Sequence, residues 1–362
     1  MQWSHAVTLV CLFLLLSSCS KPVALDEKAL ETFEQEGLLS LNCSKTYGFS
    51  FPPFANERQM DLTIHELGQL HVDRVRLAID WRNREPSKGV YDWGPMDRRM
   101  ARAREANVSV FLTVPAIGPD WACEGEGGMC VFNDESSFRD YVKQIVTRYE
   151  LDKIQFGNEW ETDYPGGMDT YIRFNNILYN VTKAYSPGTT VVLGGITKAY
   201  PLIELYCEGG AKPDFSDMRF AEGYDERSLL KRIDDELCGS GISADVRMVF
   251  REARYDMIDI HLYDDPLNWK AYLDVLPDNV AVVVSEFGGP SSVFEETGGI
   301  YQARRLYAYL ETIEVLPVTE AYHFKLVDTS YSYHAHSGLL DENLRRKPAY
   351  QIFSSCVGDS ER

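Results

Sequence analysis

The chain is short of basic residues. Its 362 residues include 36 lysines and arginines against 55 aspartates and glutamates, which gives a formal net charge of −19. Binding to nucleic acid needs basic patches that face the phosphates, so we expect no nucleic-acid partner. The acidic balance does not select a substrate, because it also serves to keep a globular protein in solution.

Metal-binding motifs are missing as well. The sequence contains no CxxC pair and no HxxxH spacing. Zinc sites with several protein ligands usually show such spacings, so a zinc site is disfavoured. We expect neither a metal nor another cofactor.

Residues 1–18 contain no lysine or arginine, although a signal peptide usually begins with positive charge. The apolar part is present: "VTLVCLFLLLSSC" is too short to span a bilayer comfortably, and small residues follow it. Leu16-Ser17-Ser18-Cys19 resembles the lipobox of bacterial lipoproteins, which implies lipidation of Cys19 after cleavage. An ordinary secretory signal is the alternative.

These features predict an exported protein of the cell envelope, on the outer membrane or the periplasmic face. The expected organisation is a signal peptide over 1–18, a lipidated tether over 19–40 and one folded domain over 41–358. The membrane would be contacted through the lipid anchor only.

Cysteine usage agrees with export, since an oxidising compartment permits disulfides. Of the eight cysteines, setting aside Cys11 and Cys19 leaves an even number. Sequence alone allows about fifteen pairings of six cysteines. The expected pairs are Cys123–Cys130, which flank a glycine-rich loop, together with Cys207–Cys238 and Cys43–Cys356.

Apolar, strand-like runs alternate with amphipathic ones along most of the chain. Strands that are apolar throughout are buried on both faces, as in a parallel sheet. Eight strand–helix units predict an α/β fold, a single-domain (β/α)₈ TIM barrel. A doubly wound open sheet is the alternative, but no glycine-rich phosphate loop follows the first run. The predicted strands are 45–51, 73–79, 108–114, 153–159, 190–195, 257–263, 280–286 and 319–325.

Helical spacing recurs between these strands. The predicted helices cover 57–71, a run from Met96, 136–149, 169–185, 269–276, 299–314 and 347–356. The stretch 196–254 is the longest insertion, and we expect a helix over 228–237 in it.

Two of the strand-like runs end in a glutamate. "IQFGNEWET" carries Asn158 and Glu159, and "VAVVVSEFGG" carries Glu286. These are the predicted strands 4 and 7, and the C-terminal ends of barrel strands surround one pocket. Retaining glycosidases need two carboxyl groups about 5 to 5.5 Å apart, one as nucleophile and one as acid/base. Their proximity is expected to raise the pKa of one of them, which keeps the acid protonated near neutral pH.

The motifs "GNEW" and "SEFGG", in this order and on these strands, resemble the two signatures of glycoside hydrolase clan A, whose members are retaining enzymes on TIM barrels. The stretch "RVRLAIDWRNREPSKGVYDWGPMDRRMARAREANVSVFLTV", the "HLY" tripeptide and "KPAYQIF" are similar in style to families 39, 5 and 42. The resemblance implies that Glu159 is the general acid/base and Glu286 the nucleophile. For the pair, salt-bridged strand ends are the plain alternative.

The same resemblance implies a set of supporting residues. Asn158 would bind the substrate hydroxyl beside the anomeric carbon, and Arg76 would lie beside Glu286 and favour its charged form. His261 and Tyr263 would contact the nucleophile or the acid/base. An ion pair that closes the barrel and a core histidine bonded to backbone remain the alternatives for Arg76 and His261.

Aromatic side chains at strand ends are candidates for sugar contacts, with ordinary packing as the alternative. Clan A enzymes often carry a tryptophan at the end of strand 8, and here His323 or Phe324 takes that place. His334-Ala335-His336 resembles a metal pair, but metal-dependent barrel hydrolases usually carry theirs on strand 1, where this chain has no histidine. The candidates are Trp81, Trp121, Trp160 and Trp269, with Tyr331, Tyr333, His334 and His336 as the rim of the cleft.

The expected function is therefore a retaining glycoside hydrolase. It would cleave β-glycosidic bonds of a poly- or oligosaccharide by double displacement, and its partner is that carbohydrate. A non-catalytic glycan-binding lipoprotein on the same barrel is one alternative, although a binder has no need of both acids. A transglycosidase with the same residues is the other.

Overall fold

The computed structural model of the chain describes residues 27–124, 128–212, 226–263, 266–288, 299–330 and 334–358. The expected signal peptide, the lipidation site Cys19 and the two rim residues Tyr331 and Tyr333 lie outside these ranges. Among the helices of the described ranges, none has the length and apolar character to cross a membrane.

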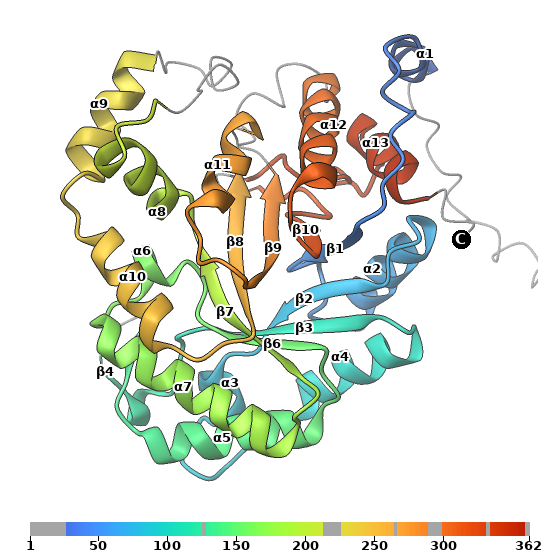
Figure 1. Cartoon of the computed structure of the whole chain (residues 1–362). Helices are drawn as coiled ribbons and strands as arrows, with labels where there is room; N and C mark the ends of the chain where they lie inside the picture. The colour runs from blue at the N-terminus through green and yellow to red at the C-terminus, as the bar shows by residue number, and fades with distance from the viewer. Residues whose placement is uncertain are drawn as a thin grey trace, which may run out of the picture.

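Eight parallel strands close into a barrel in the order β1-β10-β9-β8-β7-β6-β3-β2. The predicted TIM barrel is confirmed, and the open sheet is excluded (Figure 1). The barrel strands are β1 Thr46–Ser50, β2 Arg74–Ala78, β3 Ser109–Val114, β6 Lys153–Phe156, β7 Thr190–Ile196, β8 Met257–Tyr263, β9 Ala281–Gly288 and β10 Glu320–His323.

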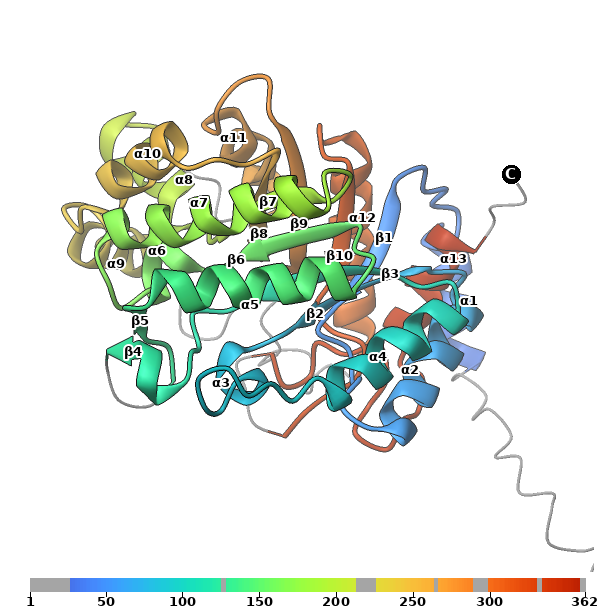
Figure 2. The same cartoon turned by 90° about the horizontal axis from the view of Figure 1, so that it is seen from below.

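The longer helices surround the barrel. They are α2 Glu57–Gln69, α4 Gly94–Glu105, α5 Glu135–Arg148, α7 Met168–Tyr185, α10 Ile242–Glu252, α12 Ile300–Val315 and α13 Pro348–Val357. Two of them, α2 and α5, begin at a side-chain cap: at the start of α5 the Asp134 carboxylate accepts a hydrogen bond of 3.0 Å from the Ser137 N–H. In Figure 2, α5 and α7 lie side by side along β6.

The helix expected within the stretch 196–254 is confirmed, but the stretch also forms helices that were not expected. Besides α9 (Glu226–Glu236), the stretch forms α10, which packs on α7 and completes the fifth strand–helix unit. The side chains of Val246 and Val249 on α10 are fully buried, at the spacing of one helical face. That spacing was visible in the sequence but did not stand out from the charged residues around it.

The barrel interior is filled in layers, as in other barrels of this size. One layer is a small apolar cluster of Phe111, Val192, Met257, Val283 and Tyr322. Gly48 makes room for it, because a Cβ there would lie 2.5 Å from the Tyr322 ring. Next to this cluster, toward the N-terminal ends of the strands, the interior is polar. Lys153 Nζ lies 2.7 Å from Glu320 Oε1, and Arg74 Nη1 lies 3.5 Å from Glu320 Oε2.

Shorter elements gather at the end of the barrel to which the arrowhead of β6 points (Figure 2). This is the C-terminal end of the strands, where a site is expected. They include α3 Trp81–Arg84, α6 Trp160–Asp163, α8 Ala199–Leu202, η2 Ile203–Glu208 and the antiparallel pair β4 Cys123–Glu124 and β5 Val131–Phe132. The remaining short elements of the described ranges are η1 Asp120–Ala122, η4 Pro266–Asn268 and α11 Trp269–Asp274.

The folded part starts earlier than the expected tether allows. Residues 19–40 were assigned to the tether, yet Glu27–Gln35 form α1, and Phe33 on it is fully buried in the core. Glu36 pairs with Arg304 of α12 at 3.0 Å. The folded part therefore includes Glu27–Gln35.

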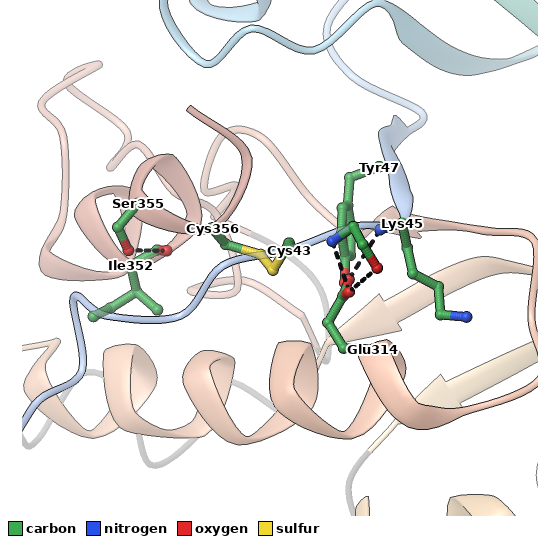
Figure 3. The surroundings of a disulfide bond; sticks show 8 residues. Cys43, Lys45, Tyr47, Glu314, Ile352, Ser355 and Cys356 are labelled. Atoms are coloured by element: carbon green, nitrogen blue, oxygen red, sulfur yellow. Dashed lines mark hydrogen bonds between the residues drawn. A yellow bond between two sulfur atoms is a disulfide. The ribbon is translucent and has the colours of Figure 1, made fainter. Parts of the chain in front are cut away.

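All six remaining cysteines are paired, and the pairs are the three expected ones: Cys43–Cys356, Cys123–Cys130 and Cys207–Cys238. Figure 3 shows the first, which joins the segment before β1 to α13. Beside it, the Glu314 carboxylate accepts hydrogen bonds from the Lys45 N–H at 3.2 Å and from the Tyr47 hydroxyl at 2.7 Å. The two ends of the barrel sequence are thus held together covalently and by hydrogen bonds.

We predict that replacing both Cys43 and Cys356 with serine lowers the free energy of unfolding by about 2 to 5 kcal/mol. The reason is chain entropy, since this bond closes a separation of 313 residues in the unfolded chain. Removing Cys123–Cys130, which closes a separation of 7 residues, is the matched control and is expected to cost less. Urea unfolding of the two double variants measures both, and a larger loss in the control contradicts the prediction.

Candidate active site

The chain turns sharply where β6 ends, and this turn places Glu159. Gly157 has φ +83°, a conformation that suits glycine, and a Cβ there would lie 2.9 Å from the Tyr171 ring. Glu159 itself has φ +48°, which is uncommon for a residue with a side chain. Strained backbone of this kind occurs often at functional sites. The turn leaves the Glu159 side chain 28% exposed at the barrel mouth.

Glu286 lies on β9 and is almost wholly buried. Arg76 of β2 donates a hydrogen bond of 2.6 Å from Nη1 to Glu286 Oε1. The Tyr263 hydroxyl, at the end of β8, donates to the other oxygen, Oε2. Both carboxylate oxygens are therefore held by donors from neighbouring parts of the barrel, which fixes the orientation of the group.

Arg76 links Glu286 to the turn after β6. Its Nη2 donates to Asn158 Oδ1 at 2.6 Å, while its Nε donates to Thr113 Oγ1 at 3.0 Å. Its side chain is completely buried, and the Phe51 ring lies 4.5 Å from the guanidinium carbon. The structure thus brings together four of the residues singled out in the sequence, Arg76, Asn158, Tyr263 and Glu286.

His261 of β8 lies between the two glutamates. Its Nδ1 is 2.8 Å from Glu159 Oε1, and its Nε2 is 3.8 Å from Glu286 Oε1. The ring is fully buried. A histidine bonded only to backbone, the plain alternative, does not describe this position.

The charges around His261 set its protonation. Burial on its own would lower the pKa of His261, but the negative charges of Glu286 and Asp259 and the hydrogen bond to Glu159 raise it to about 10. Burial would likewise raise the pKa of Glu159, but the hydrogen bond and charge of His261 outweigh it and hold the pKa below its usual range. The resting site therefore holds Glu159 ionised, which differs from the expectation of a carboxyl kept protonated by its neighbour.

Three of the four candidate tryptophans do not reach the site. The indoles of Trp81, Trp160 and Trp269 are at most 1% exposed, and each stacks on a tyrosine ring of a surrounding helix. The proposal that they contact sugar is wrong, because they pack between barrel and helices. Trp121 is half-buried, with its edge against Trp81 and its Nε1 donating to the Glu85 carbonyl.

His323 and Phe324, the two candidates for the place of the strand 8 tryptophan, face opposite ways. His323 is buried against Phe49, Phe287 and Phe353. Burial lowers its pKa to about 3, so the ring is uncharged at neutral pH. His323 is a core residue, and its assignment to substrate binding is wrong.

Phe324 is half-buried and belongs to the mouth of the barrel. Its ring is 5.4 Å from that of His334, which lies 4.5 Å from the Tyr263 ring. His334, one of the residues expected at the rim of the cleft, therefore lies beside Tyr263, whose hydroxyl donates to Glu286. His336 lies 3.9 Å from an Asp328 oxygen, in a cluster with Lys347.

Sequence reasoning missed three residues beneath this site. Asp259 and Ser285 are fully buried behind His261, and Glu161 is buried behind Glu159. Burial raises the pKa of Glu161 to about 7, although its carboxylate accepts a hydrogen bond from the Thr197 N–H. The alternation of polar residues in "DIHLY" was the signal for Asp259, since residues two apart on a strand share a face.

The trio of Glu159, His261 and Glu286 also has to be considered as a metal site. One ligand atom from each lies within 4.8 Å of the others. A cation there would compete with the Arg76 guanidinium and with a positively charged His261, which already neutralise these carboxylates. The trio therefore suits proton chemistry better than a metal.

Residues 51–149 match the model of a family described as β-galactosidase, glycoside hydrolase family 42. A search of curated proteins finds no match.

Solved structures with the same fold include several glycosidases. An exo-β-1,4-mannosidase from an Opitutaceae bacterium aligns with a TM-score of 0.61 and 14% identity, over 86% of this chain and 58% of that one. A GH5_18 enzyme from Bifidobacterium longum, solved in complex with Manβ1-4GlcNAc, aligns with a TM-score of 0.63 and 14% identity, over 88% of this chain and 78% of that one. A family 39 glycoside hydrolase from Bacteroides cellulosilyticus aligns with a TM-score of 0.56 and 14% identity, over 87% of this chain and 64% of that one. The chain thus spans little more than half of the first of these proteins. These likenesses show the fold, and the family model supports a glycosyl hydrolase over the residues that it matches.

We predict that Arg76→Met lowers the free energy of unfolding by about 3 to 5 kcal/mol, because it leaves the buried Glu286 carboxylate without its ion pair. Urea unfolding measures this loss. The double variant Arg76→Met/Glu286→Gln should recover part of it, since no unpaired charge then remains. Arg102→Met is the control, because Arg102 forms an exposed pair with Asp61 that is worth about 1 kcal/mol or less. An equal loss in both single variants contradicts the prediction.

Proposed function

We propose that the chain is a retaining β-glycosidase in which Glu286 is the nucleophile and Glu159 the general acid/base. It would cleave β-glycosidic bonds of a poly- or oligosaccharide by double displacement. The observation that carries the proposal is the separation of the two carboxylates: one oxygen of each lies within 4.8 Å of the other. Retaining enzymes place the two groups about 5 to 5.5 Å apart, whereas inverting enzymes need about 6.5 to 9.5 Å for a water.

The surroundings of the two carboxylates support different roles. The side chain of Glu286 is 8% exposed and held by donors on both oxygens, as suits a nucleophile that must be aligned with the anomeric carbon. That of Glu159 is 28% exposed, at the mouth of the barrel, where a leaving group can depart. The greater exposure of Glu159 favours it as the general acid/base, which exchanges protons with the leaving group and with water.

The reaction would proceed in two steps. In the first, a Glu286 oxygen bonds to the anomeric carbon, the glycosidic bond breaks, and the leaving oxygen takes a proton from Glu159. In the second, Glu159 takes a proton from water, the water oxygen bonds to the anomeric carbon, and Glu286 is released as a carboxylate. Asn158, whose Oδ1 is engaged by Arg76, would direct its amide N–H toward the neighbouring sugar hydroxyl.

Aromatic rings close to Glu286 would form one wall of the sugar site. Phe324 occupies the end of β10, and the His334 ring lies against that of Tyr263. This wall replaces the tryptophan that clan A enzymes often carry there, so the chain would hold its sugar differently from relatives that have the indole. The names of the structural neighbours point to mannosides and glucosides as the first sugars to test.

The test is hydrolysis of aryl β-mannosides, β-glucosides, β-galactosides and β-xylosides by the purified chain. Glu286→Ala is expected to abolish turnover, because no covalent intermediate can form. Glu159→Ala should retain far more activity on aryl glycosides with good leaving groups than on oligosaccharides, since a good leaving group needs little protonation.

Equal losses of Glu159→Ala on both kinds of substrate would refute the acid/base assignment. Binding of glycans without turnover of any aryl glycoside or oligosaccharide would instead establish a binding protein on the same barrel. Transfer of the sugar to an added acceptor, rather than to water, would identify a transglycosidase.

We further infer that the chain is exported and anchored through a lipid on Cys19, which the lipobox-like Leu16-Ser17-Ser18-Cys19 supports. Cys19→Ala is expected to move the protein from the membrane fraction to the soluble one. Cys11→Ala, in the apolar stretch of the same segment, is the control and should stay with the membrane. Membrane association that survives Cys19→Ala would rule out the anchor.

A further inference from the structure

Three carboxylates lie close to the ring nitrogens of His261. Glu159 Oε1 lies 2.8 Å from Nδ1, and both Asp259 Oδ2 and Glu286 Oε1 lie 3.8 Å from Nε2. β7 contributes Gly195, where a Cβ would lie 2.3 Å from Nε2. Two of these carboxylates, those of Asp259 and Glu286, have little access to solvent, and the three together need more positive charge than Arg76 alone supplies. A charged imidazole at the centre of the three provides it.

The hydrogen bonds behind the ring determine which ring nitrogen carries a proton. Asp259 accepts from the Ser285 N–H at 2.9 Å with one oxygen and from the Ser285 hydroxyl at 2.5 Å with the other. The single hydroxyl proton of Ser285 is thus used, so Ser285 Oγ can only accept from His261 Nε2, 3.1 Å away. Nε2 therefore keeps its proton in either state of the ring.

One mobile proton remains, on the line between His261 Nδ1 and Glu159 Oε1. If the imidazole is charged, Nδ1 donates and Glu159 is a carboxylate; if the imidazole is neutral, Glu159 must be the donor. The charge of Glu286, 3.8 Å from the ring, favours the first arrangement. The two arrangements differ only in the position of this proton.

We propose that His261 stores the proton that Glu159 delivers to the leaving group, and that the charge on Glu286 decides when it is released. This proposal rests on the function proposed above. When Glu286 attacks the anomeric carbon it becomes a neutral ester, and the main charge that holds the proton on His261 is lost. The proton then passes from Nδ1 to Glu159 and on to the departing oxygen.

Protons, bonds and charges balance in both steps. Before attack the site holds Glu286 and Glu159 as carboxylates and His261 as a cation. After glycosylation Glu286 is an ester, Glu159 is again a carboxylate and His261 is neutral, so Glu159 is ready to act as a base. In the second step water gives a proton through Glu159 to His261 Nδ1, the water oxygen bonds to the anomeric carbon, and the ester bond breaks to restore the Glu286 carboxylate. Asp259 and Ser285 are positioning residues that keep Nδ1 directed at Glu159.

The proton can be located without any sugar, by NMR of the ¹⁵N-labelled histidine rings over a pH titration. The chain has seven histidines, and the His261 signals are those missing from His261→Gln. In the wild-type chain we expect His261 to be charged at neutral pH and to lose its proton only near pH 10. In Glu286→Gln, which removes the charge but keeps the shape, the titration midpoint should fall by about 1 to 3 pH units.

Asp61→Asn is the control, because Asp61 is an exposed carboxylate on α2 that pairs with Arg102, and it should leave the midpoint unchanged. If Glu286→Gln does not fold, Asp259→Asn removes another negative neighbour and should shift the midpoint in the same direction. A His261 that is neutral at pH 7 in the wild-type chain, or a midpoint that does not move when Glu286 loses its charge, overturns the proposal. Since no substrate is present, this result is independent of whether the chain hydrolyses any glycoside.

Discussion

The mouth of the barrel depends on one buried guanidinium group. Arg76 contacts Ser50 of β1, Thr113 of β3, Asn158 after β6 and Glu286 of β9, so a single side chain connects four parts of the closed sheet. A fully buried cation is costly unless its donors and its charge are both satisfied. Here the satisfying groups are those at the proposed centre of reaction. The arrangement that keeps the charge in the core therefore also fixes the distance between the two carboxylates.

Much of this arrangement could be predicted from the sequence, because a parallel barrel constrains it strongly. Strands buried on both faces read as uninterrupted apolar runs. Six of the eight barrel strands lie within the predicted ranges, and β7 and β9 extend one and two residues past theirs. A polar residue at the end of such a run can only point into the mouth or into solvent. That is why Glu159 and Glu286, about 130 residues apart in the chain, were expected to meet.

The direction in which a side chain points was much harder to predict. Trp160 follows Glu159 directly, yet its indole turns away from the mouth, stacks on Tyr171 and donates to the Gly194 carbonyl. His323 follows Tyr322, which fills the barrel interior, so the alternation of the strand sends His323 outward against α13. The sequence prediction placed both side chains in the mouth because they lie at strand ends. A shift of one residue along a strand, however, moves a side chain to the other face. The charge state of His261 was equally hidden, because it depends on distances to groups on three separate strands.

The Cys43–Cys356 bond turns almost the whole barrel into a covalent ring. Every barrel strand lies between its two cysteines. A protease that cuts one surface loop therefore opens the ring without releasing a fragment, and the severed ends stay linked through the sulfur bridge. The barrel also keeps its native neighbours after such a cut, because its first strand and its last helix cannot diffuse apart.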